Sequence, residues 1–145
     1  MKWRNLFLVS FFCALVALRG QDCPLGLGGT DPQQIAKVFE FDTTQEQRML
    51  NWVDSLEHKN APLQLELDEL LASHPQQTPQ QLTAMGQKYE EIKEKMVRNS
   101  RFYDRLLLGI FRPVQYRKYA ELCAELDLYP LEQTSEAFLK GKENE

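Results

Sequence analysis

Residues 82–110 read LTAMGQKYEEIKEKMVRNSRFYDRLLLGI, and this stretch decides the fold. Apolar residues recur in it at steps that alternate between three and four, and Asn99 is the only polar residue on the same rhythm. This spacing predicts a helix that packs lengthwise against another helix. Begun at Pro79, it would run for about 48 Å at about 1.5 Å per residue. The apolar positions are Leu82, Met85, Tyr89, Ile92, Met96, Tyr103, Leu106 and Ile110.

A partner helix is predicted upstream, beginning near Asp42. Its apolar residues keep the same rhythm, and Asn60 takes the polar place on it. Because proline lacks a backbone N–H and clashes with the preceding turn, Pro62 predicts a kink or a brief break near Asn60. Asparagine at such a position more often fixes helix register than binds a ligand, and we expect this of Asn60 and Asn99. The apolar positions are Met49, Val53, Leu56, Leu63, Leu67 and Leu70.

The turn between these two helices is HPQQTP at 74–79. Thr78 suits an N-cap and Pro79 suits the first helical position. Such a turn makes the two helices antiparallel, so the start of one lies beside the end of the other. We therefore expect an all-α fold built on a long antiparallel helical hairpin. Near the turn it would be only two helices thick, and it should dimerise or present apolar side chains to a partner.

Short helices are expected on both sides of the hairpin. Asp31 can cap a first helix, and Pro113 can open a fourth helix that Pro130 ends. A further short helix is expected within 131–139. No segment alternates with the two-residue period of a strand, so we expect no sheet. The apolar stripes would be Ile35, Val38 and Phe39 in the first helix and Tyr116, Tyr119, Cys123 and Leu126 in the fourth.

Residues 1–20 have the features of a secretory signal. Lys2 and Arg4 precede an apolar run at 6–18, which is shorter than the roughly 20 residues that a membrane span needs. We expect a cleaved signal, with a retained anchor or a buried helix as alternatives. The protein would then be periplasmic, or extracellular if its source is eukaryotic. The chain divides into a signal peptide (1–20), an irregular leader (21–30), a helical domain (31–130) and a C-terminal short helix and tail (131–145).

The charge balance is acidic. The full chain has a net charge of −4; without the three basic residues of 1–20, 14 basic residues face 21 acidic ones, a net charge of −7. This balance argues against generic binding of nucleic acid or anionic lipid. Positive charge gathers locally on the third helix and its exit, either as a solvated face with ion pairs or as a docking surface for acidic or unfolded clients. The candidate client-binding residues are Arg98, Arg101, Arg105, Arg117 and Lys118.

Two cysteines remain once Cys13 leaves with the signal, namely Cys23 and Cys123. Export into an oxidising space makes a disulfide between them plausible, which would tie the leader to the last major helix. The alternatives are a buried thiol at Cys123 and an intermolecular bridge through Cys23.

The sequence offers little for a metal site or for catalysis. His58 and His74 would lie about 24 Å apart on one straight helix, too far to share an ion, although a dimer could bring histidines together. No cysteine, histidine and aspartate spacing resembles a zinc site, so we expect no metal and no cofactor. A nucleophile would need an adjacent base and an orienting group, which two isolated histidines do not supply. We therefore expect a non-catalytic protein.

One pentapeptide pattern occurs twice, as FDTTQ at 41–45 and as FRPVQ at 111–115. Each copy places a bulky apolar residue just outside a predicted helix start and a glutamine in the first turn. The apolar residue can pack back as a staple, and the glutamine can reach the free backbone N–H groups. Antiparallel packing would bring both copies to the same end of the molecule. The motif residues are Phe41, Asp42, Gln45, Phe111, Arg112 and Gln115.

This repeat resembles the Leu-Thr-x-x-Gln motif of the Spy/CpxP family of bacterial periplasmic proteins, whose second copy follows a long helix. The resemblance covers 41–126, although phenylalanine replaces leucine in both copies and Asp42 and Arg112 replace threonine. It implies a cradle-shaped, all-helical dimer. Spy is a chaperone that works without ATP, and CpxP is an accessory inhibitor of an envelope-stress sensor kinase. The family's chaperones tend to be basic, whereas this chain is acidic.

Three functional hypotheses follow. In the first, the protein is a Spy/CpxP-like dimer that binds unfolded or envelope proteins or acts on a sensor protein, without nucleic acid and without stable membrane insertion. In the second, it is a heavy-metal sensor or resistance protein, as the similar ZraP and CnrX groups are. In the third, it is a secreted helical protein that binds a ligand or a lipid.

Overall fold

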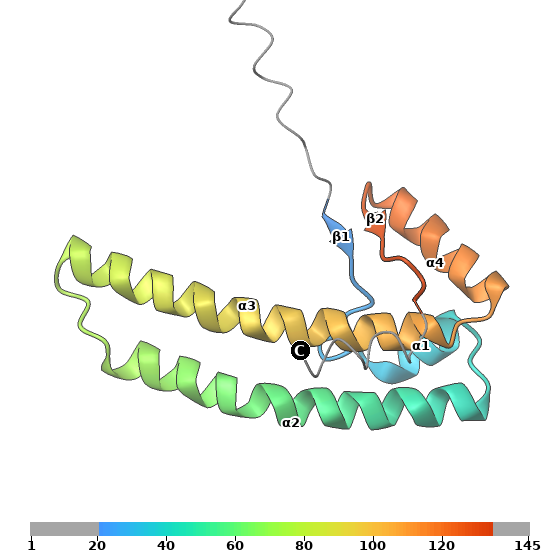
Figure 1. Cartoon of the computed structure of the whole chain (residues 1–145), viewed down its shortest axis with the longest axis horizontal. Helices are drawn as coiled ribbons and strands as arrows, with labels where there is room; N and C mark the ends of the chain where they lie inside the picture. The colour runs from blue at the N-terminus through green and yellow to red at the C-terminus, as the bar shows by residue number, and fades with distance from the viewer. Residues whose placement is uncertain (1–20, 135–145) are drawn as a thin grey trace, which may run out of the picture.

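The computed structural model describes residues 21–134 and is mostly α-helical. In chain order its elements are β1 (Asp22–Cys23), α1 (Pro32–Val38), α2 (Thr43–Ser73), α3 (Pro79–Gly109), α4 (Pro113–Glu125) and β2 (Tyr129–Pro130). The two long helices, α2 and α3, lie side by side with opposite chain directions (Figure 1). The other elements gather at the end where α2 begins and α3 ends.

The helices begin where the local sequence can satisfy free backbone N–H groups. Asp42 caps α2, because its carboxylate accepts from the Gln45 N–H at 2.9 Å. Thr78 caps α3 in the same way, accepting from the Gln81 N–H at 3.2 Å. The proline at the first position of α3 loses no hydrogen bond there, since that N–H would have no partner within the helix.

The second helix runs through Pro62 from Thr43 to Ser73, so the brief break that proline predicted is absent. Lengthwise packing holds both halves of α2 on α3, with Leu56 buried before the proline and Leu67 buried after it. The Asn99 side-chain amide also donates to the Asn60 oxygen at 2.9 Å across the two helices, beside Pro62. These contacts offset the one hydrogen bond that the proline removes.

The main hydrophobic core lies at one end of the molecule. It combines residues of 23–56 with residues of 102–131, and nothing from 57–101 belongs to it. The α3 side chains Leu106, Leu107 and Leu108 are fully buried there. In residues 57–73 of α2 and 79–101 of α3, only Leu67 and Ile92 are buried. Within these ranges, we call residues 60–73 of α2 and 79–97 of α3 the distal half.

The expectation of no sheet is wrong. β1 and β2 pair in parallel, with Asp22 opposite Tyr129 and Cys23 opposite Pro130. Strands of two residues are too short to show an alternating pattern in the sequence. Their pairing depends on long-range contacts, among them the disulfide that joins the two cysteines at 23 and 123.

Three further expectations need correction. Residues 131–134 have no regular secondary structure, so the predicted helix is missing from the described part of 131–139. Leu126 and Val38 are exposed, so neither belongs to the buried stripe of its helix. Residues 1–20 and 135–145, which include the predicted signal and most of the tail, lie outside the described residues. Across 21–134, every helix falls short of the length and apolar character that a membrane crossing requires.

Candidate functional site

The two repeated pentapeptides meet through their glutamines. The Gln45 Nε2 donates to the Gln115 Oε1 at 2.9 Å, and the Gln115 Nε2 donates to the Gln45 Oε1 at 3.1 Å. Both side chains are buried. The antiparallel packing expected of the two long helices would bring these residues to the same end of the molecule, and the structure places them in contact.

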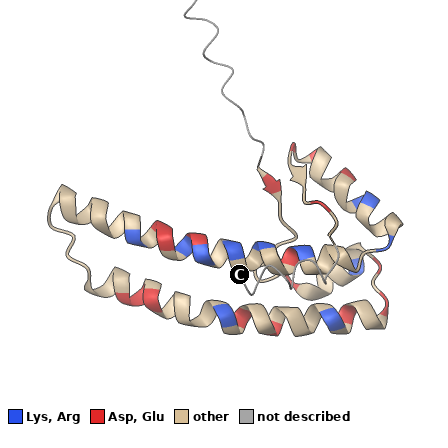
Figure 2. Cartoon of the chain, viewed as in Figure 1, with Lys and Arg blue, Asp and Glu red and all other residues tan. Residues whose placement is uncertain are grey.

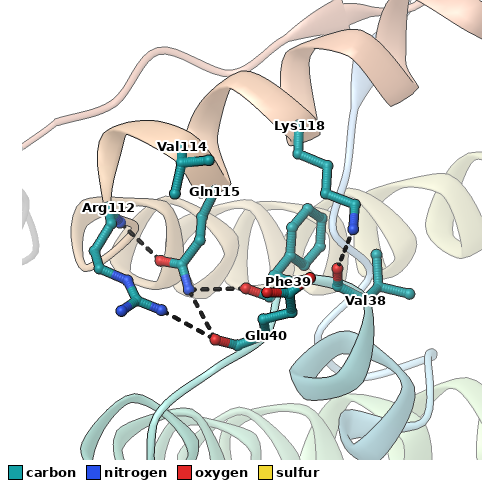
Figure 3. Close-up of a pocket in the computed structure, with 7 residues that line it drawn as sticks. All are labelled: Val38, Phe39, Glu40, Arg112, Val114, Gln115 and Lys118. Atoms are coloured by element: carbon teal, nitrogen blue, oxygen red, sulfur yellow. Dashed lines mark hydrogen bonds between the residues drawn. The ribbon is translucent and has the colours of Figure 1, made fainter.

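Each glutamine also caps the start of its own helix. The Gln45 Oε1 accepts from the Asp42 N–H at 3.3 Å, and the Gln115 Oε1 accepts from the Arg112 N–H at 2.7 Å. Each amide nitrogen donates to a carbonyl at the end of another helix. Gln45 donates to Ile110 at the end of α3, and Gln115 donates to Phe39 at the end of α1, both at 2.8 Å. Two helix starts and two helix ends therefore meet at one pair of amides, which we call the glutamine joint. Figure 3 shows the contacts of Gln115 with Phe39, Glu40 and Arg112.

The phenylalanines of the repeat pack around this joint. The rings of Phe41 and Phe111 lie 5.4 Å apart and nearly perpendicular, and Phe39 lies 4.9 Å from Phe111. Edge-to-face contacts of this kind stabilise aromatic clusters beyond the area that they bury. The residues at the apolar position of each copy thus contact each other rather than only their own helices.

Lys118 and Arg112 bind the carbonyl end of α1. The Lys118 Nζ donates to the Val38 carbonyl at 2.7 Å, and the Arg112 Nη2 donates to the Glu40 carbonyl at 3.0 Å (Figure 3). Cations stabilise this end of a helix because its carbonyls carry partial negative charge and lack partners within the helix. Lys118, which the sequence marked for client binding, therefore has a structural role as well.

The remaining candidate arginines do not form one site. Arg98 lies 3.5 Å from Glu94 on the same helix, and Arg101 lies 3.4 Å from Asp22 on the N-terminal segment. Arg105 follows on α3, while Arg117 is exposed on α4. Figure 2 shows that positive charge on α3 lies mainly toward the core end, whereas α2 carries acidic residues near the far turn.

The N-terminal strap, residues 21–30, is tied to α4 by a disulfide between Cys23 and Cys123, whose Cα atoms are 5.7 Å apart. Both cysteines are buried. Tyr119 reinforces the tie, because its hydroxyl donates to the Cys23 carbonyl and accepts from the Leu131 N–H at 2.9 Å. The free thiol and the intermolecular bridge are therefore not the states of these cysteines in the structure.

Asp104 holds the same strap on α3, and the sequence analysis missed it. Its fully buried carboxylate accepts from the backbone N–H groups of Leu25 at 3.0 Å, Gly26 at 3.2 Å and Leu27 at 3.0 Å. Burial raises the pKa of the Asp104 carboxyl, and the three N–H groups offset part of that rise. The available signal was one acidic residue within an otherwise apolar helix end, which requires buried donors.

Gly26 allows the strap to turn over this carboxylate. It has a φ of 72°, and its carbonyl accepts from the Gly29 and Thr30 N–H groups at 2.8 and 2.7 Å. A side chain is disfavoured at this φ, and a Cβ would approach the Thr30 Oγ1 to 2.8 Å. Glycine therefore fixes the position of three N–H donors.

The histidines stand apart on α2 and in the turn that follows it. His58 is exposed, with its Nδ1 3.8 Å from the Asp54 carboxylate, and the His74 Nδ1 lies 2.9 Å from the Pro75 carbonyl. Among residues 21–134 no group of three or more His, Cys, Asp or Glu side chains could hold a metal ion. Buried side-chain polar atoms in the same residues all have hydrogen-bond partners. The glutamine joint thus offers no unpaired buried group to a ligand.

Comparison with protein-family models, with curated proteins and with solved structures finds no match to this chain.

Proposed function

We propose that this chain is an exported, non-catalytic protein similar to Spy/CpxP proteins, which works in the periplasm as a homodimer and holds unfolded clients on the hairpin of α2 and α3. The single observation that carries the proposal is the exposure of apolar side chains on the distal half. Leu65, Leu71, Leu82 and Val97 are all exposed there.

The distal half is only two helices thick. Two helices in contact cover each other along one line, and each keeps most of its surface in water. Leu70, Met85 and Tyr89 of the same section are only half-buried, which adds to its accessible apolar surface. Large apolar surface that stays accessible is typical of sites that bind other proteins.

The arginines of α3 suit a client as well. Arg98, Arg101 and Arg105 recur at steps of three and four, so they share one helix face. Their long stems can cover apolar client segments while the guanidinium groups stay in water. These arginines lie on α3 beyond the distal half, toward the core end, so a client that extends from the distal half in that direction would meet cations as well as apolar side chains.

The rigid core end supports this role. Its strap, glutamine joint and disulfide fasten every short element to the long helices, so binding on the distal half would not require the core to open. A surface held by a stable base loses little conformational entropy when it binds. The disulfide also suits the oxidising space in which the proposal places the protein.

The test is suppression of aggregation. The purified protein is added at stoichiometric amounts to a chemically denatured substrate protein that is diluted into buffer, and light scattering is followed. We expect reduced scattering, and we expect the double variant Leu65→Gln and Val97→Gln to lose most of the effect. Val114→Gln is the matched control, since Val114 is about as exposed as Leu65 but lies on α4. Absence of suppression by the wild type would rule out the client-binding form of the proposal.

A further inference from the structure

An apolar groove lies between the N-terminal strap, α1 and α4, away from the distal half. We call it the α1–α4 groove. It encloses about 220 Å³ beside the disulfide, and its lining contains no charged residue. Aliphatic and aromatic side chains make up most of its walls, namely Leu25, Ile35, Val38, Phe39, Leu122 and Leu126. Thr30 and Gln34 are its main polar side chains besides the Tyr119 hydroxyl, which is already hydrogen-bonded.

The open side of this groove is unusually apolar for a protein surface. Val38, Leu122 and Leu126 are exposed at 41%, 37% and 67%, although the chain has a well-packed core within reach. On α4, Val114, Lys118, Leu122 and Leu126 follow one another at steps of four, so they form one stripe along the helix. This stripe is apolar except for Lys118. From Lys118 to Leu126 it spans about 12 Å.

Cations lie at one end of the groove. A smaller cavity of about 70 Å³ shares Val38 and Phe39 with it and is lined by Arg112, Lys118 and Glu40 (Figure 3). Two positive groups and one carboxylate leave this cavity with a net positive charge. Lys118 donates one hydrogen bond to the Val38 carbonyl at the end of α1, and Arg112 donates one to the Glu40 carbonyl just after it, which leaves further N–H groups on both side chains.

We propose that the α1–α4 groove binds a free fatty acid, with the acyl chain along Leu122 and Leu126 and the carboxylate at Lys118 and Arg112. The proposal is independent of client binding on the distal half. Charge complementarity selects the head group, because an anion at the cation end gains charge-assisted hydrogen bonds. The uncharged walls then select a chain that needs no polar partner.

A bound peptide fits this groove less well than a hydrocarbon. A peptide backbone brings an N–H and a C=O group with every residue, and each would need a partner when buried. Thr30 and Gln34 are too few to hydrogen-bond with every such group along a peptide. An acyl chain has none of them, so its transfer from water into the groove loses no hydrogen bond.

Calorimetry with laurate, below the concentration at which it forms micelles, tests the proposal. We expect saturable binding of one laurate per chain. Affinity should fall by about two- to fourfold for each methylene removed, as decanoate and octanoate would show, because each buried methylene contributes to transfer out of water. Leu122→Gln combined with Leu126→Gln should weaken laurate binding by about tenfold or more.

Matched controls separate the groove from general effects. Leu65→Gln changes a leucine that is about as exposed as Leu126 but lies on α2, and it should leave laurate affinity unchanged. Lys118→Gln should weaken laurate about three- to tenfold but leave the neutral dodecanol unaffected, whereas Lys37→Gln removes a neighbouring α1 cation that does not line the groove and should change neither. Circular dichroism checks that each variant is folded.

Three outcomes would overturn the inference: no saturable laurate binding, an affinity that is independent of chain length, or an equal loss in Leu65→Gln. Because the client assay uses Leu65 and Val97 instead, the groove variants should still suppress aggregation. Loss of laurate binding alone therefore concerns the groove, and loss of suppression alone concerns the distal half.

Discussion

Asp104 is the residue whose protonation most directly links stability to pH. Because burial raises its pKa in the folded chain, the folded chain holds this proton more tightly than the unfolded chain does. The stability that it contributes is fully present below the unfolded pKa and is lost as pH rises through the folded pKa. A tenfold difference in proton affinity corresponds to about 1.4 kcal/mol.

The variant Asp104→Asn tests this linkage, because asparagine keeps the shape but cannot ionise. We expect the free energy of unfolding of the wild type, relative to that of the variant, to increase as pH falls from neutral toward the usual range of a carboxyl pKa. Urea unfolding at a series of pH values measures it. Gln87→Asn, at an exposed amide on α3 that cannot ionise, is the control and should show no such trend. The opposite trend would mean that the three N–H bonds outweigh burial.

At the scale of elements, the glutamine joint couples the starts of α2 and α4. Gln45→Ala and Gln115→Ala should each lower the free energy of unfolding by about 2–3 kcal/mol, since each leaves buried backbone groups without partners. The double variant should lose less than the sum, by about 0.5–3 kcal/mol, because each glutamine is the other's partner. Chemical denaturation of the four proteins gives the coupling energy.

Gln87→Ala serves as the control for that cycle, because Gln87 is exposed on α3. It should change stability by no more than about 0.5 kcal/mol, the range of ordinary surface substitutions. Strict additivity of the two joint variants would show that the amides act separately. In that case each loss of stability would come from the separate helix cap of that glutamine, and the bond between the two amides would contribute nothing.

The helix starts could be predicted because their causes are local, whereas the predicted end of α4 at Pro130 is wrong, since α4 ends at Glu125 and Pro130 lies in β2. Asp42, Thr78 and the prolines that open α3 and α4 act within a few residues of themselves, so their effect is visible in the sequence. The strand pair, and the hydrogen bonds that Asp104 accepts from backbone N–H groups, each join segments about 80 to 110 residues apart. No local spacing in the sequence encodes such contacts. Pro62 failed as a break signal for the same reason, since packing on α3 overrides a local preference.

The candidate site divides along the same line. The repeat identified Gln45 and Gln115 because helix starts carry recognisable capping residues. It could not show that the two amides bond to each other, nor that Lys118 caps α1, because both depend on how α1 and α4 approach each other. The α1–α4 groove was missed because Leu126 and Val38 fit the apolar rhythm and were assigned to the core.

For the whole molecule, the uneven core predicts association. One end has a packed core, while the distal half exposes Leu71 and Leu82 on either side of the turn at 74–78. Two copies that covered each other at this turn would remove Leu71 and Leu82 from water, at about 25 cal/mol per Å² of apolar area, and would leave Leu65 and Val97 open to a client. We expect light scattering to give twice the chain mass. The double variant Leu71→Glu and Leu82→Glu should lower the measured mass to that of one chain, since two carboxylates per copy would face apolar surface.

Reductant and position separate this dimer from other forms of association. The disulfide lies within one chain, so reduction should not halve the mass. Val114→Glu places the same charge on an exposed α4 position and should leave the mass unchanged. A monomeric wild type would mean that the distal half stays open to water, which would make it entirely available to clients. A dimer that survives both leucine substitutions would instead place the contact on the core end, where Val114→Glu would be the informative variant.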